Sequence, residues 1–181
     1  MTSIVVTALY LSVPLLVSGL GHMAVVRWDL LSAWKRPMHE RAFGANKTWR
    51  GLLVMPLLTI PGVWLGRFLD PPLEPMLLVS LRDAPLVPLG AGLGVAYILA
   101  ELPNSWWKRR LGIPPGDLPE RGRAFQLLVD QADSAVGCAA VYALLLGPSL
   151  PLLIALILVG PAVHLLANLG LYLVGLRERP V

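Results

Sequence analysis

Apolar residues fill five long stretches of the 181-residue chain, and most charged residues lie between these stretches. Each stretch holds about 20 residues, the length that an α-helix needs to cross a hydrocarbon core of roughly 30 Å. A soluble helical bundle would show a polar stripe along every helix, and most of these stretches show none. The pattern predicts an all-α integral membrane protein, a bundle of about five transmembrane helices at residues 3–26, 51–69, 85–102, 125–146 and 151–176.

Basic residues are concentrated in two of the predicted loops, residues 27–50 and 103–124, and the C-terminal tail adds Arg177 and Arg179. The connections on the opposite side carry only two cations, Arg67 and Arg82. Since basic loops stay inside, both loops and the C-terminus are expected in the cytoplasm and the N-terminus outside. We therefore expect a multi-pass cell-membrane protein whose active site faces the cytoplasm.

Composition agrees with a single membrane domain over residues 1–181. Hydrophobic residues make up 56% of the chain and the mean hydropathy is +0.68, above the roughly 45–50% apolar share of soluble domains. The lone cysteine, Cys138, excludes a disulfide framework and a multi-cysteine zinc site. The net charge of +4 does not indicate nucleic-acid binding, because the basic residues lie in loops between apolar stretches.

Two acidic residues, Asp130 and Asp133, lie inside the predicted span 125–146. A charge at the centre of a membrane helix costs roughly 2.5–3.5 kcal/mol, so each needs a compensating interaction. Their spacing places both on one helical face with Gln126 and Gly137, about 8–12 Å beyond the start of the span. The pair is either a polar contact within the bundle or a site for Mg²⁺, which takes carboxylate and phosphate oxygens as ligands.

The ends of the two basic loops carry further candidates for phosphate binding. Before the second span, Lys47 and Arg50 supply charge, while Asn46 and Thr48 supply hydrogen bonds to phosphate or ribose. The other loop begins with Asn104, Ser105, Lys108 and Arg109, shortly after Glu101, and a Pro114-Pro115 turn is expected to fold these residues over the aspartate helix. Both clusters have an alternative role as interfacial anchors beside Trp49, Trp106 and Trp107.

Three weaker signals concern helix packing. His164 and Asn168, one turn apart, favour an interhelical hydrogen bond over a ligand contact. Gly90 and Gly94 fit small-xxx-small helix packing. His22 and His39 flank the first loop without a recognisable pattern, and surface or interfacial roles are the default.

Three motifs together resemble those of CDP-archaeol synthases, small membrane cytidylyltransferases related to phosphatidate cytidylyltransferases. They are GANKTWRG at residues 44–51, ELPNSWWKRRLGIPPG at 101–116 and DQADS at 130–134. The chain departs from the resemblance at His39-Glu40-Arg41, where an Asp-Gly-Arg type of turn is expected. It also lacks the extra N-terminal spans of the larger phosphatidate enzymes, so it is more similar to the archaeol branch.

The resemblance implies that CTP and an archaeol-type lipid phosphate, 2,3-di-O-geranylgeranylglyceryl phosphate, give a CDP-lipid and pyrophosphate with Mg²⁺. It implies that Asp130 and Asp133 hold the metal and, with Lys108 and Arg109, are catalytic. Substrate binding would fall to Asn46, Lys47, Thr48, Arg50, Glu101, Asn104 and Ser105.

Other functions remain open at this point. A CDP-diacylglycerol synthase acting on phosphatidic acid is one alternative. An ion- or proton-coupled transporter is another, although the chain shows no internal repeat. A non-catalytic scaffold subunit with lipid-binding loops is a third, and the sequence leaves a homo-oligomer open.

Overall fold

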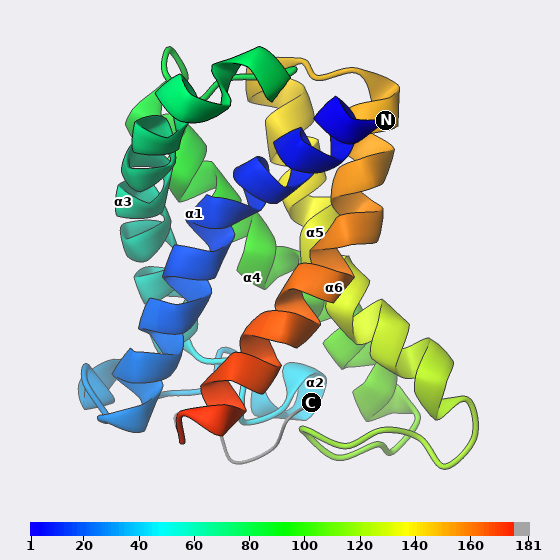
Figure 1. Ribbon diagram of the computed structural model, residues 1–181. Coiled ribbons are helices and arrows are strands. Elements are labelled where there is room, and N and C mark those ends of the chain that lie inside the picture. Colours follow the sequence, from blue (N-terminus) through cyan, green and yellow to red (C-terminus); the bar gives the residue numbers. More distant parts are fainter. Residues whose placement is uncertain (176–181) are drawn as a thin grey trace.

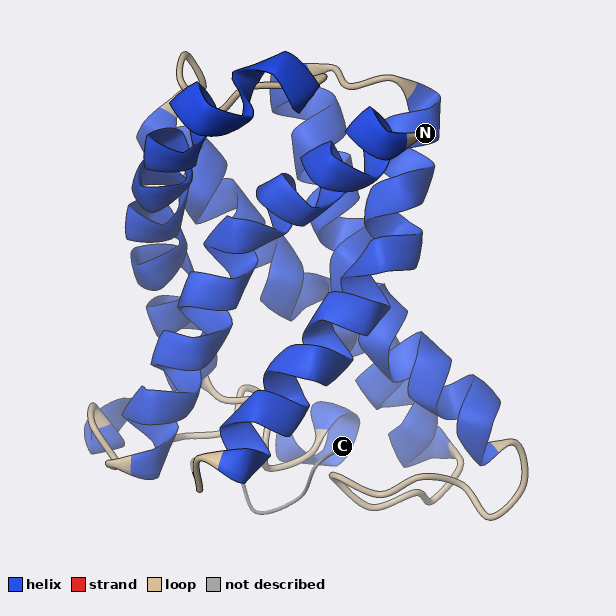
Figure 2. Cartoon of the chain, in the orientation of Figure 1, coloured by secondary structure: helices blue, strands red, loops and turns tan. Residues whose placement is uncertain are grey.

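The computed structural model describes residues 1–175, in which every regular element is a helix (Figure 1, Figure 2). Five helices are long and apolar enough to cross a membrane, which confirms the predicted all-α membrane bundle. Short helices occupy the connections: η1 (Ser32–Trp34), α2 (Glu40–Phe43) and η2 (Glu74–Met76). The long helices are α1 (Thr2–Arg27), α3 (Trp49–Leu73), α4 (Leu86–Arg110), α5 (Arg123–Leu146) and α6 (Leu150–Leu173).

The helix α4 continues to Arg110, past residue 102, where the third predicted span ends. Pro103 lies inside this helix, although proline lacks an N–H donor and crowds the preceding turn. The helix nevertheless continues, since Asn104 and Lys108 in its last turns bond to Asp130 of α5. The loop predicted at residues 103–124 is therefore only residues 111–122.

The other boundaries shift less. The first loop spans residues 28–48 instead of 27–50, because Thr48 caps α3 by accepting a hydrogen bond from the Gly51 N–H. α3 runs to Leu73, past the predicted end at residue 69, and α6 ends at Leu173. The predicted end of the last span at residue 176, Arg177 and Arg179 lie outside the described residues.

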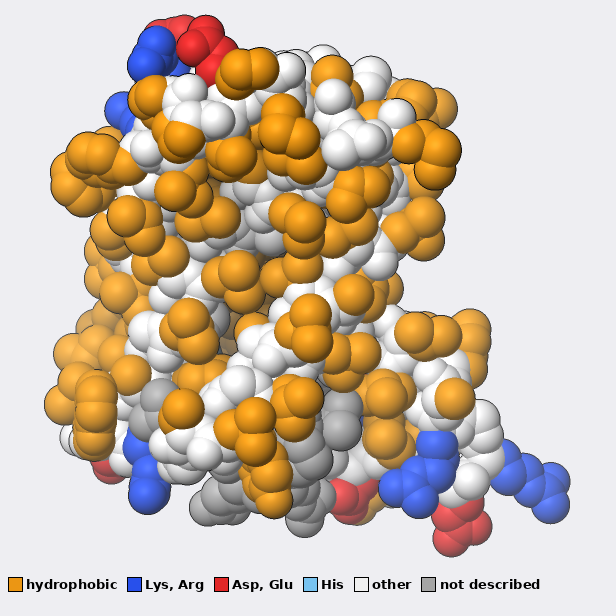
Figure 3. Space-filling model, in the orientation of Figure 1, with side chains coloured by type: hydrophobic (Ala, Val, Ile, Leu, Met, Phe, Trp, Pro, Cys, Tyr) orange, Lys and Arg blue, Asp and Glu red, His pale blue; other side chains and the backbone are white. Residues whose placement is uncertain are grey.

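The two ends of the bundle differ in chemistry. Residues 28–48 and 111–122 lie at one end with the last turn of α6, and we call this the basic end (Figure 1). The connections 74–85 and 147–149 lie at the opposite end. Apolar side chains cover the flank between the ends, while Lys, Arg, Asp and Glu gather at the ends themselves (Figure 3).

The hydrophobic core fills the half of the bundle away from the basic end. It combines the start of α1 with the end of α5, as Leu11 and Tyr142 show: both are almost fully buried, and the Tyr142 hydroxyl donates to the Leu11 carbonyl at 2.6 Å. Leu89 and Leu93 of α4 and Leu152 of α6 complete the cluster. With the core at this end, polar side chains of the same helices are free to enclose space at the basic end.

Glycines bring α4 into direct contact with α3. A Cβ added at Gly94 would lie 2.4 Å from the Pro56 backbone, and one at Gly90 would lie 2.6 Å from the Ile60 backbone. No side chain larger than hydrogen fits at either position, which confirms the small-xxx-small interpretation of this pair. The close approach of α3 and α4 fixes the position of Glu101 and Lys108 further along α4.

Candidate active site

A cavity of about 230 Å³ lies at the basic end, between α4, α5 and the loop that precedes α3. We call it the charged cavity. Gly116 and Leu118 of the loop after α4 also line it, so this loop folds over the site as the proline turn predicted. The cavity brings together nine of the predicted site residues: Asn46, Lys47, Glu101, Asn104, Ser105, Lys108, Arg109, Asp130 and Asp133.

The two aspartates of α5 turn toward one amide group of α4. Asn104 Nδ2 donates to Asp130 Oδ1 at 2.7 Å and to Asp133 Oδ2 at 3.1 Å. Gln126, one turn before Asp130, donates from Nε2 to the same Asp130 oxygen at 2.8 Å and to Asn104 Oδ1 at 2.9 Å. The two carboxylates therefore face a common point in the cavity, which the Asn104 donor nitrogen occupies.

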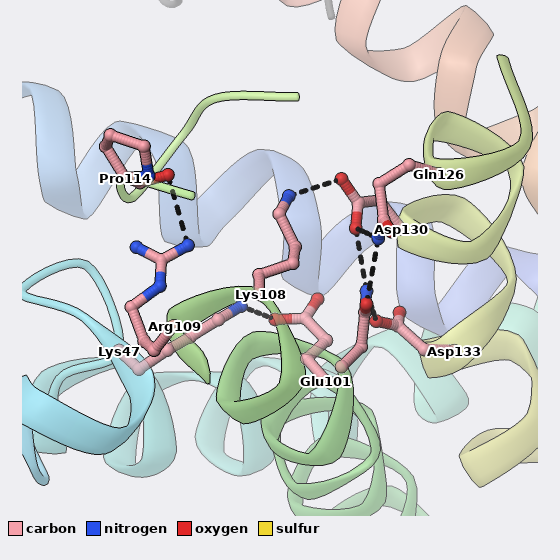
Figure 4. Close-up of polar contacts among 9 residues, drawn as sticks. Lys47, Glu101, Lys108, Arg109, Pro114, Gln126, Asp130 and Asp133 are labelled. Atoms are coloured by element: carbon pink, nitrogen blue, oxygen red, sulfur yellow. Dashed lines mark hydrogen bonds and ion pairs between the residues drawn. The ribbon is translucent and has the colours of Figure 1, made fainter. Parts of the chain in front are cut away.

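Two cations of α4 enter the cavity from its last turns (Figure 4). Lys108 Nζ bonds to Asp130 Oδ2 at 2.9 Å, and the Lys108 side chain is only 9% exposed. Arg109 donates from Nη2 to the Pro114 carbonyl at 3.1 Å, while its buried Nε and Nη1 have no hydrogen-bond partner. Unpartnered guanidinium N–H groups are suited to phosphate oxygens, which bind arginine through paired hydrogen bonds.

The loop before α3 places Lys47 opposite Glu101 of α4, and the two form an ion pair. Two backbone bonds hold this loop: Met38 N donates to the Lys47 carbonyl, and Trp49 N donates to the Arg36 carbonyl. Gly44 makes the turn possible, because it has a φ of +92° and a Cβ there would lie 2.9 Å from the Pro115 ring. Glycine adopts this conformation without steric cost.

Two predicted site residues, Thr48 and Arg50, lie outside the charged cavity. They line a neighbouring cavity of about 830 Å³ together with Lys35 and Arg36, and Lys47 lines both cavities. Thr48 is the N-cap of α3, and its hydroxyl accepts a hydrogen bond from the Gly51 N–H. Arg50 is buried.

Arg50 instead anchors the turn after α1. It donates from Nη1 to Asp29 Oδ1 at 2.9 Å and to the Leu30 carbonyl at 3.2 Å. Lys35 also pairs with Asp29, at 3.1 Å. These partners, with the Arg50 hydrogen bond first, lower the pKa of Asp29 below its usual 3.8. No recognisable sequence pattern indicates Asp29, because the turn that presents it to Arg50 is a tertiary feature.

Two of the three histidines, His164 and His39, have hydrogen-bond partners in the structure. The interhelical hydrogen bond expected at His164 is confirmed, with Tyr97 of α4 as its partner at 3.2 Å. His39 caps α2, since its Nδ1 accepts from the Ala42 N–H at 3.1 Å. The segment His39-Glu40-Arg41, which departs from the Asp-Gly-Arg type of turn, therefore supplies the N-cap of α2.

Two glutamines belong to the site although they were not among the predicted site residues. Gln126 bonds to both Asn104 and Asp130, and its spacing from Asp130 on one helical face was the available signal. Gln131 lines the charged cavity, is 6% exposed, and its Oε1 has no hydrogen-bond partner. No spacing in the sequence indicated Gln131, because its position depends on how α5 meets α6.

The charges in the cavity suit a polyphosphate with a divalent cation. Lys47, Lys108 and Arg109 balance the carboxylates of Glu101, Asp130 and Asp133, so the charged cavity has no large excess of positive charge. A nucleoside triphosphate would bring several negative charges, which a divalent cation would offset. Among residues 1–175 no group of three or more His, Cys, Asp or Glu forms a ready metal site, so phosphate oxygens would have to complete the coordination.

The fold and the site define a multi-pass membrane protein whose helix ends enclose a charged cavity suited to phosphate groups. The family model described as CarS-like, CDP-archaeol synthase, matches residues 38–181. The chain therefore belongs to the CDP-archaeol synthase family, and its relatives indicate a cytidylyltransferase.

Individual relatives agree with this assignment. A CDP-archaeol synthase of Thermofilum pendens is 32% identical over 147 residues, a match that spans 78% of this chain and 60% of the relative. CDP-archaeol synthases of Halorubrum lacusprofundi and Halobacterium salinarum are each 33% identical over 150 residues; the matches cover 77% and 78% of this chain and 77% of each relative. No solved structure matches the chain significantly. The comparisons do not favour a CDP-diacylglycerol synthase or a transporter.

Proposed function

We propose that this protein transfers the cytidylyl group of CTP to an archaeol-type lipid phosphate, 2,3-di-O-geranylgeranylglyceryl phosphate, and releases pyrophosphate. Membership of the CDP-archaeol synthase family supports the reaction. The observation that carries the site is the single cavity in which Asp130, Asp133, Lys108 and Arg109 meet beside Lys47. We place this site at the cytoplasmic face of the cell membrane, because the basic loops surround it and CTP is a cytoplasmic nucleotide.

In the reaction, a phosphate oxygen of the lipid attacks the α-phosphorus of CTP while the bond to the β-phosphate oxygen breaks. A phosphate monoester has a second pKa near 6 and is mostly dianionic at pH 7, so the attack needs no strong general base. Positioning and charge neutralisation therefore supply most of the rate enhancement. Lys108 and the free N–H groups of Arg109 are placed to bind the departing pyrophosphate.

Mg²⁺ fits the site on the chemistry of its donors. Asp130 and Asp133 would hold it at the point their carboxylates share, where Asn104 Nδ2 now donates to both. When bound, the ion would neutralise charge on the triphosphate. Ser105 and Asn46 line the same cavity and are placed to orient phosphate or ribose oxygens, with Lys47 and Glu101 beside them.

The lipid phosphate would meet CTP at the edge of the charged cavity. Lys47 lines this cavity and the neighbouring one that contains Arg50, Lys35 and Arg36, so the basic surface extends from one to the other. Arg50 donates hydrogen bonds to Asp29 and to the Leu30 carbonyl. We propose that its main role is to hold this loop in place and that phosphate binding is secondary.

The direct test is to incubate the purified protein with CTP labelled in its α-phosphate, Mg²⁺ and a panel of lipid phosphates with ether-linked isoprenoid or ester-linked acyl chains. We expect a labelled CDP-lipid and an equal amount of pyrophosphate, with the isoprenoid ether preferred. Asp133→Asn should lower turnover by at least about 100-fold, the cost typical of a lost electrostatic group in an active site.

The matched control for this variant is Asp83→Asn, which changes an exposed carboxylate at the opposite end of the bundle. It should keep full activity, and both variants should keep the thermal unfolding transition of the wild type. Absence of any nucleotide-bearing lipid from the folded wild-type protein would refute the proposed reaction. Full turnover by Asp133→Asn would refute the role of the aspartate pair alone.

A further inference from the structure

A second cavity, of about 370 Å³, runs between α1 and α6 and has mostly apolar walls. We call it the α1–α6 groove and define it by Leu16, Gly19, Met23, Gly160, Ala167 and Leu171. The two helices lie close together near the N-terminus and, in this view, are farthest apart in the middle of the bundle (Figure 1). The molecular surface is hollowed between them on the face that Figure 3 shows.

Small residues keep this groove open. A Cβ added at Gly19 of α1 would have no heavy atom within 4 Å, so the space beside it is empty. On the other wall, a Cβ at Gly160 would lie 2.7 Å from the Ala135 Cβ, so this glycine lets α6 pack closely on α5. The close packing of α6 on α5 leaves the open space on the side of α1.

The inner end of the groove is continuous with the charged cavity. Six polar side chains line both: Asn46, Lys47, Glu101, Gln131, His164 and Asn168. The outer wall is apolar and reaches the flank of the bundle, where Leu20 of α1 is 46% exposed. The groove therefore joins the hydrocarbon side of the protein to the charged site by a path that changes from apolar to polar.

We propose that the α1–α6 groove holds the glycerol backbone and the first part of the hydrocarbon chains of the lipid phosphate substrate. This proposal rests on the proposed function, because it assumes that the charged cavity receives the phosphate. An amphiphile of this kind matches the path: its chains would contact Leu16, Gly19 and Ala167, and its phosphate would reach Lys47. The substrate would thus enter sideways from the bilayer between α1 and α6.

The dimensions agree with this occupant. The groove residues of α1 extend from Ser12 to Met23, about 16 Å along the helix. Its volume lies in the lower part of the range of roughly 300–1,000 Å³ that is typical of small-molecule sites. It is therefore large enough for part of a lipid, and the remaining chain length would stay in the bilayer.

The test uses substrate protection of an introduced thiol, which does not depend on turnover. Cys138 is the only cysteine of the sequence and is 2% exposed, so Gly19→Cys adds a single accessible thiol in the groove. The matched control is Gly170→Cys on α6, where a Cβ also meets nothing within 4 Å but which does not line the groove. Both proteins are treated with N-ethylmaleimide, with and without a long-chain lipid phosphate.

We expect the lipid phosphate at ten times its Kd to slow alkylation of the Gly19→Cys thiol about tenfold, because only about one site in ten remains free. The Gly170→Cys thiol should react at an unchanged rate, and the corresponding neutral lipid without phosphate should protect neither. Equal rates with and without the lipid phosphate, or equal protection of both thiols, would overturn the proposal.

A kinetic variant gives a second readout. Gly19→Leu fills the groove, so it should raise the KM for the lipid phosphate and leave the KM for CTP unchanged; equal KM values for the lipid in variant and wild type would overturn the proposal. Failure of the proposed function is distinguishable from failure of the groove. If the wild type forms CDP-lipid but Gly19→Cys is not protected, only the groove is refuted; if protection occurs without CDP-lipid, only cytidylyl transfer is refuted.

Discussion

Asn104 has a central position among the charged side chains of the site. Its amide group donates to both aspartates and accepts from Gln126, so one neutral residue of α4 orients two acids of α5. Lys108, one turn further along α4, neutralises one of these acids. The polar face of α4 thus compensates the cost of carboxylates in an otherwise apolar helix.

Two basic residues in the last turn of α4, Lys108 and Arg110, should differ sharply in their effect on activity. Lys108 is buried and paired with Asp130, whereas Arg110 is exposed and lies over the Trp106 ring at 4.8 Å. Lys108→Ala should lower kcat/KM for CTP by about 100–1,000-fold, since it removes a cation from the phosphate site.

The matched variant Arg110→Ala should stay within about threefold of the wild type, because an exposed cation contributes little. Steady-state kinetics with CTP as the varied substrate measure both effects. Equal losses in the two variants would indicate that these residues act as membrane anchors and not as phosphate ligands.

The Asp29 carboxylate should make the stability of the basic end depend on pH. Its hydrogen bond to Arg50 lowers its folded-state pKa below the usual 3.8, so its stabilising contribution is present above pH 3.8 and is lost as the pH falls through the lower folded-state value. Thermal unfolding of the wild type and Asp29→Asn in detergent should show a difference in Tm that is constant at neutral pH and disappears in acid. A difference that is unchanged below the folded-state pKa would contradict this assignment.

At the level of elements, the α3–α4 contact determines where the site residues of α4 lie. Gly94 packs against the Pro56 backbone so closely that a methyl group must displace one of the helices. Gly94→Ala should therefore lower the free energy of unfolding by about 1–3 kcal/mol, the usual cost of overpacking.

Gly170→Ala is the control for this prediction, because a Cβ there meets no atom and alanine favours helix by about 1 kcal/mol over glycine. Its Tm in detergent should equal or exceed that of the wild type. A Gly94→Ala variant as stable as Gly170→Ala would show that the two helices can separate without cost.

At the level of the whole molecule, the bundle is packed at one end and open at the other. The core lies in the half away from the basic end, where Arg67 of α3 also fixes the connection before α4 by donating to the Leu81 and Ala84 carbonyls. Lys47 and Glu101, which lie toward the basic end, line all three cavities. This division lets the protein keep a stable fold while polar groups face a space for ligands.

Orientation in the membrane can be measured directly. Because the basic loops are expected inside, a reporter fused to the N-terminus should be active only outside the cytoplasm, and one fused after residue 181 only inside. Alkylation of a cysteine introduced at exposed Asp83 by an impermeant reagent gives an independent check from the outer side. Labelling of that thiol only after the cells are opened would reverse the predicted topology.

The sequence alone determined that five apolar helices span a membrane, that Asp130 and Asp133 share a face, and that three motifs resemble a cytidylyltransferase family, since hydropathy, helical periodicity and motif spacing are local properties. Tertiary structure decided that α4 continues through Pro103, that Arg50 turns away to Asp29, and that Gln131 joins the site. It also opened the α1–α6 groove. These features depend on how close two helices approach and where they separate, which contacts between distant residues set and no local pattern records.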